Sequence, residues 1–326
     1  MFRAKRAIFG RTPLNAFLLE MTSQNQNGRL ACKGFHRGIQ WGHVDLKFRH
    51  HWDSCWSTHM VSPVEQIQLK ITRSKRHLGE LQNQVSAFFA SAPYQVATKR
   101  DPGTGQLIYF VSRVEEVPLM IAVVAGDLMQ NLRSALDHLA YRLVLAGTAG
   151  ATPVRHVYFP IADSVEKYEE IKGSFLAGVR PEAIMAIDAV KPYWGGTDAL
   201  WRLHKLNIID KHRLLLMVGS AFRSFDLGAV MQRQMEKSFL AWNQERGIQL
   251  PPFLVRPGDR MFPLKINDEL FTDLPEAEPN EKVKFNFEVS FQEPEADVRN
   301  GEPLVETLAG LITVVEGAIN QVAPLI

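Results

Sequence analysis

One stretch of this chain, residues 118–145, carries polar side chains at the spacing of an α-helix. They are Asp127, Asn131, Ser134, His138 and Tyr141, separated by 4, 3, 4 and 3 residues. At 3.6 residues per turn these positions fall on one stripe. Asn and Ser are weak helix formers, so the stripe indicates an internal hydrogen-bonded network, a water-lined groove or a binding site.

Arg133 and His138 stand five positions apart within the same stretch. An imidazole titrates near neutrality and can take up and return a proton. A planar guanidinium can neutralise the charge that develops on a phosphate ester. Two alternatives need no chemistry: Arg133 pairs with Asp137 one turn later, and His138 is a buried histidine hydrogen-bonded to Tyr141.

The spacing Arg-x4-His in a long helix resembles the HEPN superfamily, over about residues 63–145. The resemblance implies a helical domain and a metal-independent ribonuclease site that two copies complete. In that scheme His138 moves the proton of the RNA 2′-hydroxyl and Arg133 stabilises the phosphorane. No cofactor takes part.

A second group of polar and basic residues lies within residues 200–213. It comprises His204, Lys205, Asn207, Lys211, His212 and Arg213. Together with Arg133 and His138, this group suits an anion-binding groove for RNA or a nucleotide. Alternatively, His138, His204 and His212 hold a metal ion with an Asp, as in DinB-like hydrolases. In a third interpretation, Lys211, His212 and Arg213 complement the dipole at the end of a helix.

Two segments together resemble an uncharacterised family of bacterial proteins. They are Gly-Asp-Leu-Met-Gln-Asn-Leu-Arg-Ser-Ala-Leu-Asp-His-Leu at 126–139 and Leu-Asn-Ile-Ile-Asp-Lys-His-Arg at 206–213. The likeness spans most of residues 60–326. It implies a bacterial cytoplasmic protein and no particular activity.

The elements that would position these residues follow from periodicity. Ser62, Pro63 and Glu65 form a capping box at the start of a helix whose apolar stripe has heptad spacing and needs a partner. The remaining predicted elements are a hairpin at 94–111, a helix at 118–145, a strand at 154–159, helices at 165–172, 181–190 and 197–211, strands at 213–220 and 283–291, and a helix from Pro303.

We therefore expect an α+β fold in which a helical bundle packs with an antiparallel β-sheet. Residues 60–150 would form a HEPN-like helical portion with a β-hairpin insertion. Residues 151–326 would form an α+β portion whose last helix returns to the bundle. The heptad stripe of the first helix predicts a homodimer.

Residues 1–59, here called the leader, differ in composition from the rest of the chain. Cys32, His36, Cys55 and His59 could together bind zinc, and the basic first residues resemble a targeting segment. In the interpretation we prefer, the leader is a disordered stretch outside the native protein, which would begin at Met60.

Charge and composition narrow the function classes. The leader holds 9 Lys and Arg against 3 Asp and Glu, a net charge of +6, and the rest holds 28 against 32, a net charge of −4. A mildly acidic body argues against DNA binding. Both Cys lie in the leader, which fits a reducing compartment, and no apolar run approaches a membrane span. RNA is the expected ligand, either bound or cleaved, and a non-catalytic interaction protein is the competing interpretation.

Overall fold

A computed structural model of the chain describes residues 62–151, 157–213, 219–226, 254–255, 263–280 and 283–326. Contacts divide the chain into two units, Met1–Met60 and Val61–Ile326, and all of the described residues belong to the second. The proposed zinc ligands Cys32, His36, Cys55 and His59 lie outside the described residues.

The first described helix, α2 (Pro63–Ala90), begins at the predicted capping box. Ser62 Oγ accepts a hydrogen bond from the Glu65 N–H at 3.1 Å, and Glu65 Oε2 accepts one from the Ser62 N–H at 2.6 Å. Two of the unpaired amides at the helix start are thereby satisfied. The capping box is confirmed.

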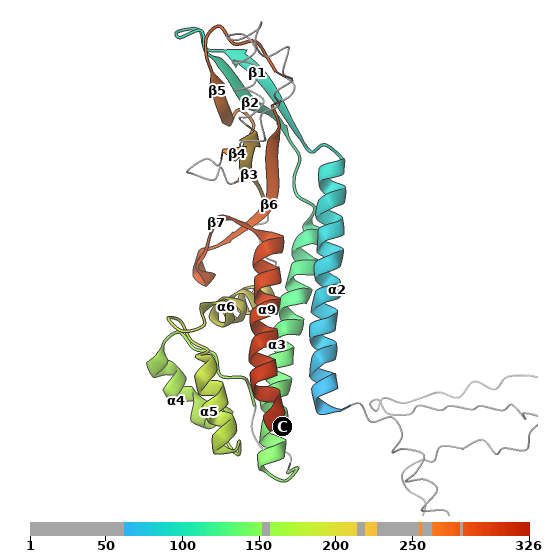
Figure 1. Ribbon diagram of the computed structural model, residues 1–326, viewed down its shortest axis with the longest axis vertical. Helices are drawn as coiled ribbons and strands as arrows, with labels where there is room; N and C mark the ends of the chain where they lie inside the picture. Colours follow the sequence, from blue (N-terminus) through green and yellow to red (C-terminus); the bar gives the residue numbers. More distant parts are fainter. Residues whose placement is uncertain (1–61, 152–156, 214–218, 227–253, 256–262, 281–282) are drawn as a thin grey trace, which may run out of the picture. The chain divides into compact units, whose positions relative to one another are not determined.

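A β-hairpin connects α2 to α3 (Leu119–Gly147). Its strands are β1 (Tyr94–Arg100) and β2 (Leu107–Val114), and Asp101 Oδ1 closes the turn by accepting from the Gly103 and Thr104 amides. Ser74 and Gln66 of α2 meet Leu128 and Arg142 of α3 respectively, so the two helices run antiparallel (Figure 1).

The apolar stripe of α2 packs against α3 within the same chain. Ile67, Ile71 and Leu81 are fully buried there. The partner that the stripe requires is therefore intramolecular, and the stripe gives no argument for a second copy. The homodimer stays a prediction.

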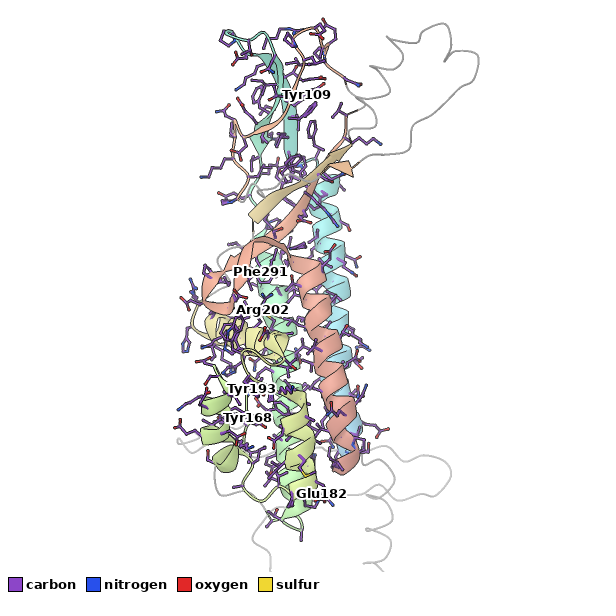
Figure 2. All side chains as sticks on the ribbon, turned by 60° about the vertical axis from the view of Figure 1, so that its left-hand side comes forward. Tyr109, Tyr168, Glu182, Tyr193, Arg202 and Phe291 are labelled. Atoms are coloured by element: carbon purple, nitrogen blue, oxygen red, sulfur yellow. The ribbon has the colours of Figure 1, made fainter. Side chains whose placement is uncertain are left out.

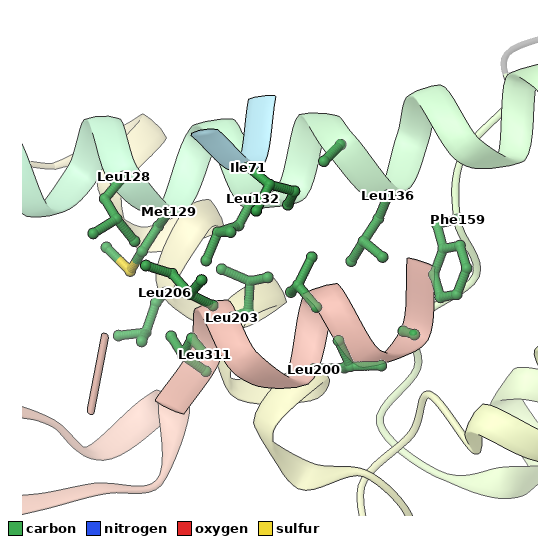
Figure 3. Close-up of a cluster of buried hydrophobic side chains, with 14 of the residues drawn as sticks. Ile71, Leu128, Met129, Leu132, Leu136, Phe159, Leu200, Leu203, Leu206 and Leu311 are labelled. Carbon is green, nitrogen blue, oxygen red and sulfur yellow. The ribbon is translucent and has the colours of Figure 1, made fainter. Parts of the chain in front are cut away.

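The bundle is completed by α9 (Leu304–Val322), which packs on both α2 and α3 as predicted (Figure 1). The three smaller helices are α4 (Val165–Phe175), α5 (Pro181–Val190) and α6 (Asp198–His212). Leu200, Leu203 and Leu206 of α6 lie with Leu132 and Leu136 of α3 in one apolar cluster (Figure 3). That cluster extends along the sequence from Ile67 to Ala323, across both predicted portions.

The described strands form two antiparallel sheets, which makes the fold α+β as predicted. One has the order β1-β2-β5, with β5 at Glu269–Asp273. The other has the order β4-β3-β6-β7, with the strands at Leu254–Val255, Gly219–Asp226, Phe285–Glu293 and Val298–Pro303. The ring centroids of Tyr94, in the first sheet, and Phe287, in the second, are 4.9 Å apart.

The sheet containing β7 is tied to α6 by ion pairs. Arg202, labelled in Figure 2, reaches Asp297 at 2.8 Å and Glu302 at 3.5 Å. Arg213 reaches Glu293 at 3.0 Å. These contacts hold α6, which carries the second predicted group of site residues, near both of its ends.

Three predictions about single elements need correction. Residues 157–159 are not a strand, because the backbone of Phe159 is bonded to side chains of α3 (below); residues 154–156 lie outside the described part. Strand β6 is not half-buried throughout, since Val289, Ser290 and Phe291 are all buried where the strand lies between β3 and β7 and contacts α9. We also predicted that no apolar run approaches a membrane span, but the segment Leu304–Leu325 is long and apolar enough to cross a membrane by length and composition. Its side chains at Leu308 and Val315 are nevertheless core residues of the bundle.

Candidate functional site

Helix α3 separates the predicted pair Arg133 and His138. Five positions along an α-helix turn the chain by roughly 140° beyond one full turn. Arg133 is 6% exposed and faces the interior, whereas His138 faces solvent. The two side chains therefore belong to different surroundings, which are described in turn.

Arg133 and Asp137 clamp the backbone of Phe159 against α3. Arg133 Nη2 donates to the Phe159 carbonyl at 2.9 Å and forms an ion pair with Asp137 Oδ1, also at 2.9 Å. Asp137 Oδ1 also accepts from the Phe159 N–H at 3.0 Å. The Phe159 ring is fully buried near Leu136 and Leu200 (Figure 3). The pair thus holds the segment that follows α3 against the helix. Arg133 is paired with Asp137, as predicted by the interpretation in which Arg133 has no catalytic role.

Burial shifts the pKa values of both Arg133 and Asp137. It lowers the pKa of the Arg133 guanidinium, and the neighbouring Asp137 charge partly offsets that effect. Burial also raises the pKa of Asp137, against the opposing effects of Arg133 and the Phe159 amide. Each charge therefore depends on the other to remain inside the protein.

His138 belongs to a surface that we call the polar seam. It consists of Gln66, Lys70 and Arg73 on α2 and of Asn131, Ser134, His138, Tyr141 and Arg142 on α3. Arg142 Nη2 donates to Gln66 Oε1 at 2.5 Å across the two helices. The pKa of His138 is lowered by partial burial, then by the charge of Lys70 and, least, by that of Arg142, against the opposing charge of Asp137. Lys70 and Arg142 thus flank the imidazole from the two helices.

The predicted polar stripe of α3 faces solvent and is not an internal network. Asp127 and His138 are exposed, and Tyr141 is 39% exposed. Asn131 Nδ2 bonds back to the Asp127 carbonyl at 2.8 Å. The prediction that His138 is a buried histidine hydrogen-bonded to Tyr141 is therefore wrong.

The polar seam has an excess of positive charge. Lys70 and Arg73 lie three residues apart and share a flank of α2, and Arg142 lies one turn beyond His138 on α3. None of these three cations forms an ion pair with a carboxylate among the residues that the structure describes. A surface with unpaired cations and a neutral histidine can bind an anion and exchange a proton with it.

The environment of Arg133, which we call the α3–α6 junction, consists of Arg133, Asp137, Asp163, Trp201, His204, Lys205 and Lys211. Asp163 accepts from Lys205 Nζ at 2.8 Å and from Trp201 Nε1 at 2.7 Å. Lys205 Nζ lies 5.6 Å from the centre of the Trp201 ring. These contacts fix the solvent side of the junction.

His204 lies on the inner side of the α3–α6 junction. Burial lowers its pKa to about 4, and the charges of Arg133, Lys205 and Lys211 act in the same direction against that of Asp163. The imidazole is therefore neutral at pH 7. Of the residues predicted to line one anion-binding groove, Arg133, His204, Lys205 and Lys211 lie at this junction, whereas His138 does not.

The other predicted residues of this region have different roles. Asn207 is buried, His212 is exposed, and Arg213 turns away to Glu293 and Glu295. Lys211 and His212 lie in the last turn of α6, where their charges favour the helix dipole. Within the described residues no three His, Cys, Asp or Glu side chains are grouped to hold a metal ion, so His138, His204 and His212 do not form the DinB-like set.

The two segments of the bacterial resemblance pack directly on each other. A Cβ atom on Gly126 of α3 would lie 2.5 Å from Asp210 Oδ1 of α6. Only glycine leaves room for this carboxylate, whose pKa is raised by burial and by Asp127. The pairing therefore has a structural basis in how α3 and α6 cross.

Several contributing residues were missed from sequence. Arg142 follows His138 at i+4 and could have been found from that spacing. Lys70 and Arg73 look like ordinary solvated residues of α2. Asp163 lies in the connection between α3 and α4, and no local pattern predicts that it meets Lys205.

No family model, no curated protein and no solved structure matches the chain.

Proposed function

We propose that this chain binds single-stranded RNA along the polar seam. The observation that carries the proposal is the exposed His138 between two cations, Lys70 and Arg142, neither of which has a carboxylate partner among the described residues. Unpaired Lys and Arg on one surface favour a phosphate backbone. The exposed Tyr141 ring adds a face on which a base can stack.

The charge distribution favours a flexible strand over a duplex. The body of the chain carries a net charge of −4, so attraction for phosphates must come from local groups of cations such as the seam. A narrow basic strip can follow a single strand, whereas duplex binding usually draws on a broader basic surface.

A second candidate function, metal-independent RNA cleavage, is favoured by the protonation state of His138. Its lowered pKa leaves the imidazole neutral at pH 7, as a general base must be. His138 would accept the proton of a 2′-hydroxyl as that oxygen attacks phosphorus, and would return the proton to the 5′-oxygen as its bond to phosphorus breaks. Because Arg133 is held by Asp137 and Phe159, Lys70 and Arg142 would take its predicted role of stabilising the phosphorane.

Binding is tested with a labelled single-stranded RNA by fluorescence anisotropy on the full chain. Replacing Lys70, Arg73 and Arg142 together by Gln should weaken binding by roughly tenfold or more at 0.1 M salt. The matched control is Lys167→Gln, on an exposed position of α4. Equal affinity of the triple variant and the wild type, or no binding by either, would refute the proposal.

Cleavage is tested with the same RNA in the presence of EDTA. A product that wild type forms and His138→Ala does not, with both proteins folded and both binding RNA, would establish the second candidate function. Binding without any product would leave RNA binding alone. Cleavage abolished by Arg133→Lys but not by His138→Ala would contradict both assignments in the seam.

The same proposal includes the predicted setting, the bacterial cytoplasm, and the predicted homodimer. The absence of Cys from residues 60–326 fits a reducing compartment. Light scattering coupled to gel filtration measures the mass directly, and two copies would bring two seams to one RNA.

A further inference from the structure

Two buried nitrogen atoms at the α3–α6 junction lack hydrogen-bond partners. They are Arg133 Nη1 and His204 Nδ1. Arg133 is 6% exposed, and its other terminal nitrogen is already used by Phe159 and Asp137. Buried polar groups in folded proteins nearly always have partners, so these two atoms call for an occupant that the chain itself does not provide.

We propose that the α3–α6 junction is a binding site for a small oxyanion, a phosphate or a carboxylate, held between Arg133 Nη1 and His204 Nδ1. An arginine N–H can only donate, so the occupant must accept hydrogen bonds. A neutral imidazole can carry its proton on Nδ1 and donate as well. Two such donors at the same junction fit an oxygen atom that bears negative charge.

The charges around these atoms favour an anion over water. Arg133, Lys205 and Lys211 are cationic, and all three act on His204. Asp137 and Asp163 are the carboxylates that face the same cluster. With His204 neutral, one positive charge remains, and a single negative charge would balance it.

The surroundings also give the site a fixed shape. Phe159 holds Arg133 from one side, and Asp163 holds Lys205 and Trp201 on the next turn of α6. Lys211 is exposed and forms no ion pair with any described residue, so it is available to an arriving anion. This site is separate from the polar seam and does not depend on RNA binding.

The test is thermal unfolding and calorimetric titration of the full chain with sodium phosphate and with sodium formate, against sodium chloride at equal ionic strength. The variants are His204→Leu, which removes Nδ1, and Arg133→Lys, which keeps the charge but removes Nη1. The control is His212→Gln, on the exposed end of the same helix. Circular dichroism establishes that each variant folds, and His204→Leu alone decides the result if Arg133→Lys does not fold.

We expect phosphate, formate or both to raise the unfolding temperature of wild type and His212→Gln above the value in chloride. The affinity should fall about tenfold or more in His204→Leu, since one of two donors is lost. A response to phosphate alone or to formate alone would identify which oxyanion the site prefers. No stabilisation by either salt, or equal stabilisation of His204→Leu and wild type, would overturn the proposal and leave a buried water as the occupant.

Discussion

Arg133 and Asp137 act on stability through a backbone that is distant in sequence. The guanidinium and the carboxylate bond the carbonyl and the amide of Phe159, which no neighbouring strand pairs. Because both charged groups lie in a site that disfavours charge, the pair stabilises the fold only as long as both members are present. Their removal is therefore a direct measure of how the segment after α3 is held.

Arg133→Met is expected to lower the free energy of unfolding by about 3–5 kcal/mol. The substitution leaves Asp137 without its counter-charge and the Phe159 carbonyl without its donor. Urea unfolding followed by circular dichroism gives the value. Asp137→Asn is the companion variant: it keeps an oxygen that can accept from the Phe159 N–H but leaves the Arg133 guanidinium without its counter-charge, so it should also lower the free energy of unfolding. A loss under about 0.5 kcal/mol for Arg133→Met would show that the clamp contributes little.

His204 is expected to make stability depend on pH. Its pKa is about 4 in the folded chain against an ordinary value of 6.5, so between these values the unfolded chain binds a proton that the folded chain does not. Stability is therefore unaffected above pH 6.5 and falls as the pH decreases toward 4. Between pH 7 and pH 5 the loss from this residue is about 2 kcal/mol.

The measurement is the free energy of unfolding of wild type and His204→Leu at pH 7 and pH 5, in chloride buffer. The variant should lose less stability than the wild type over this interval. His212→Gln should behave as the wild type does. Parallel pH dependences in all three proteins would mean that His204 is solvated in the folded chain.

At the scale of elements, the crossing of α3 and α6 depends on one glycine. Asp210 occupies the space where a side chain at position 126 would begin. The same crossing brings Arg133 and His204 together. A change at Gly126 is therefore expected to act on the α3–α6 junction as well as on stability.

Gly126→Ala is expected to destabilise the chain by roughly 1–3 kcal/mol, because the carboxylate must move away from the new methyl group. In an Asp210→Ala background the same change should become neutral or stabilising, since alanine favours a helix by about 1 kcal/mol over glycine. Gly310→Ala in α9 is the control, as nothing lies within 4 Å of its Cβ. Chemical unfolding of the wild type, Gly126→Ala, Asp210→Ala and the double variant measures the sign reversal, and its absence would show that Asp210 does not cause the constraint.

At the scale of the whole molecule, one apolar cluster joins both predicted portions of the chain. Residues of α2, α3, α5, α6 and α9 all contribute to it. The bundle and the segment that carries α4 to α6 are therefore expected to unfold together. The leader lies outside the unit Val61–Ile326, so it is the part whose removal should matter least.

Deleting residues 1–59 is expected to leave the unfolding temperature within about 2 °C of that of the full chain, a change below 1 kcal/mol. The reason is that Val61–Ile326 is compact by its own contacts. Differential scanning calorimetry compares the two proteins, and light scattering on the same samples gives their mass. A fall of several degrees would show that the leader contributes to the fold.

The elements could be read from sequence because their signals are local. The capping box at Ser62, the turn at Asp101 and the apolar period of α9 each depend on residues within a few positions of one another. Charge and cysteine content likewise need only a count. These features gave the α+β class, the bundle and the polar stripe on α3.

The surroundings of that stripe required the packed structure. Helix geometry alone separates Arg133 from His138, but it does not say which of them meets solvent. That depends on Phe159 returning to cover one face of α3, and on α2 and α6 lying along opposite flanks. Burial and neighbouring charges depend on contacts between segments that are distant in sequence. Only the packed structure therefore shows that Arg133 lies with His204, and that His138 lies with Lys70 and Arg142.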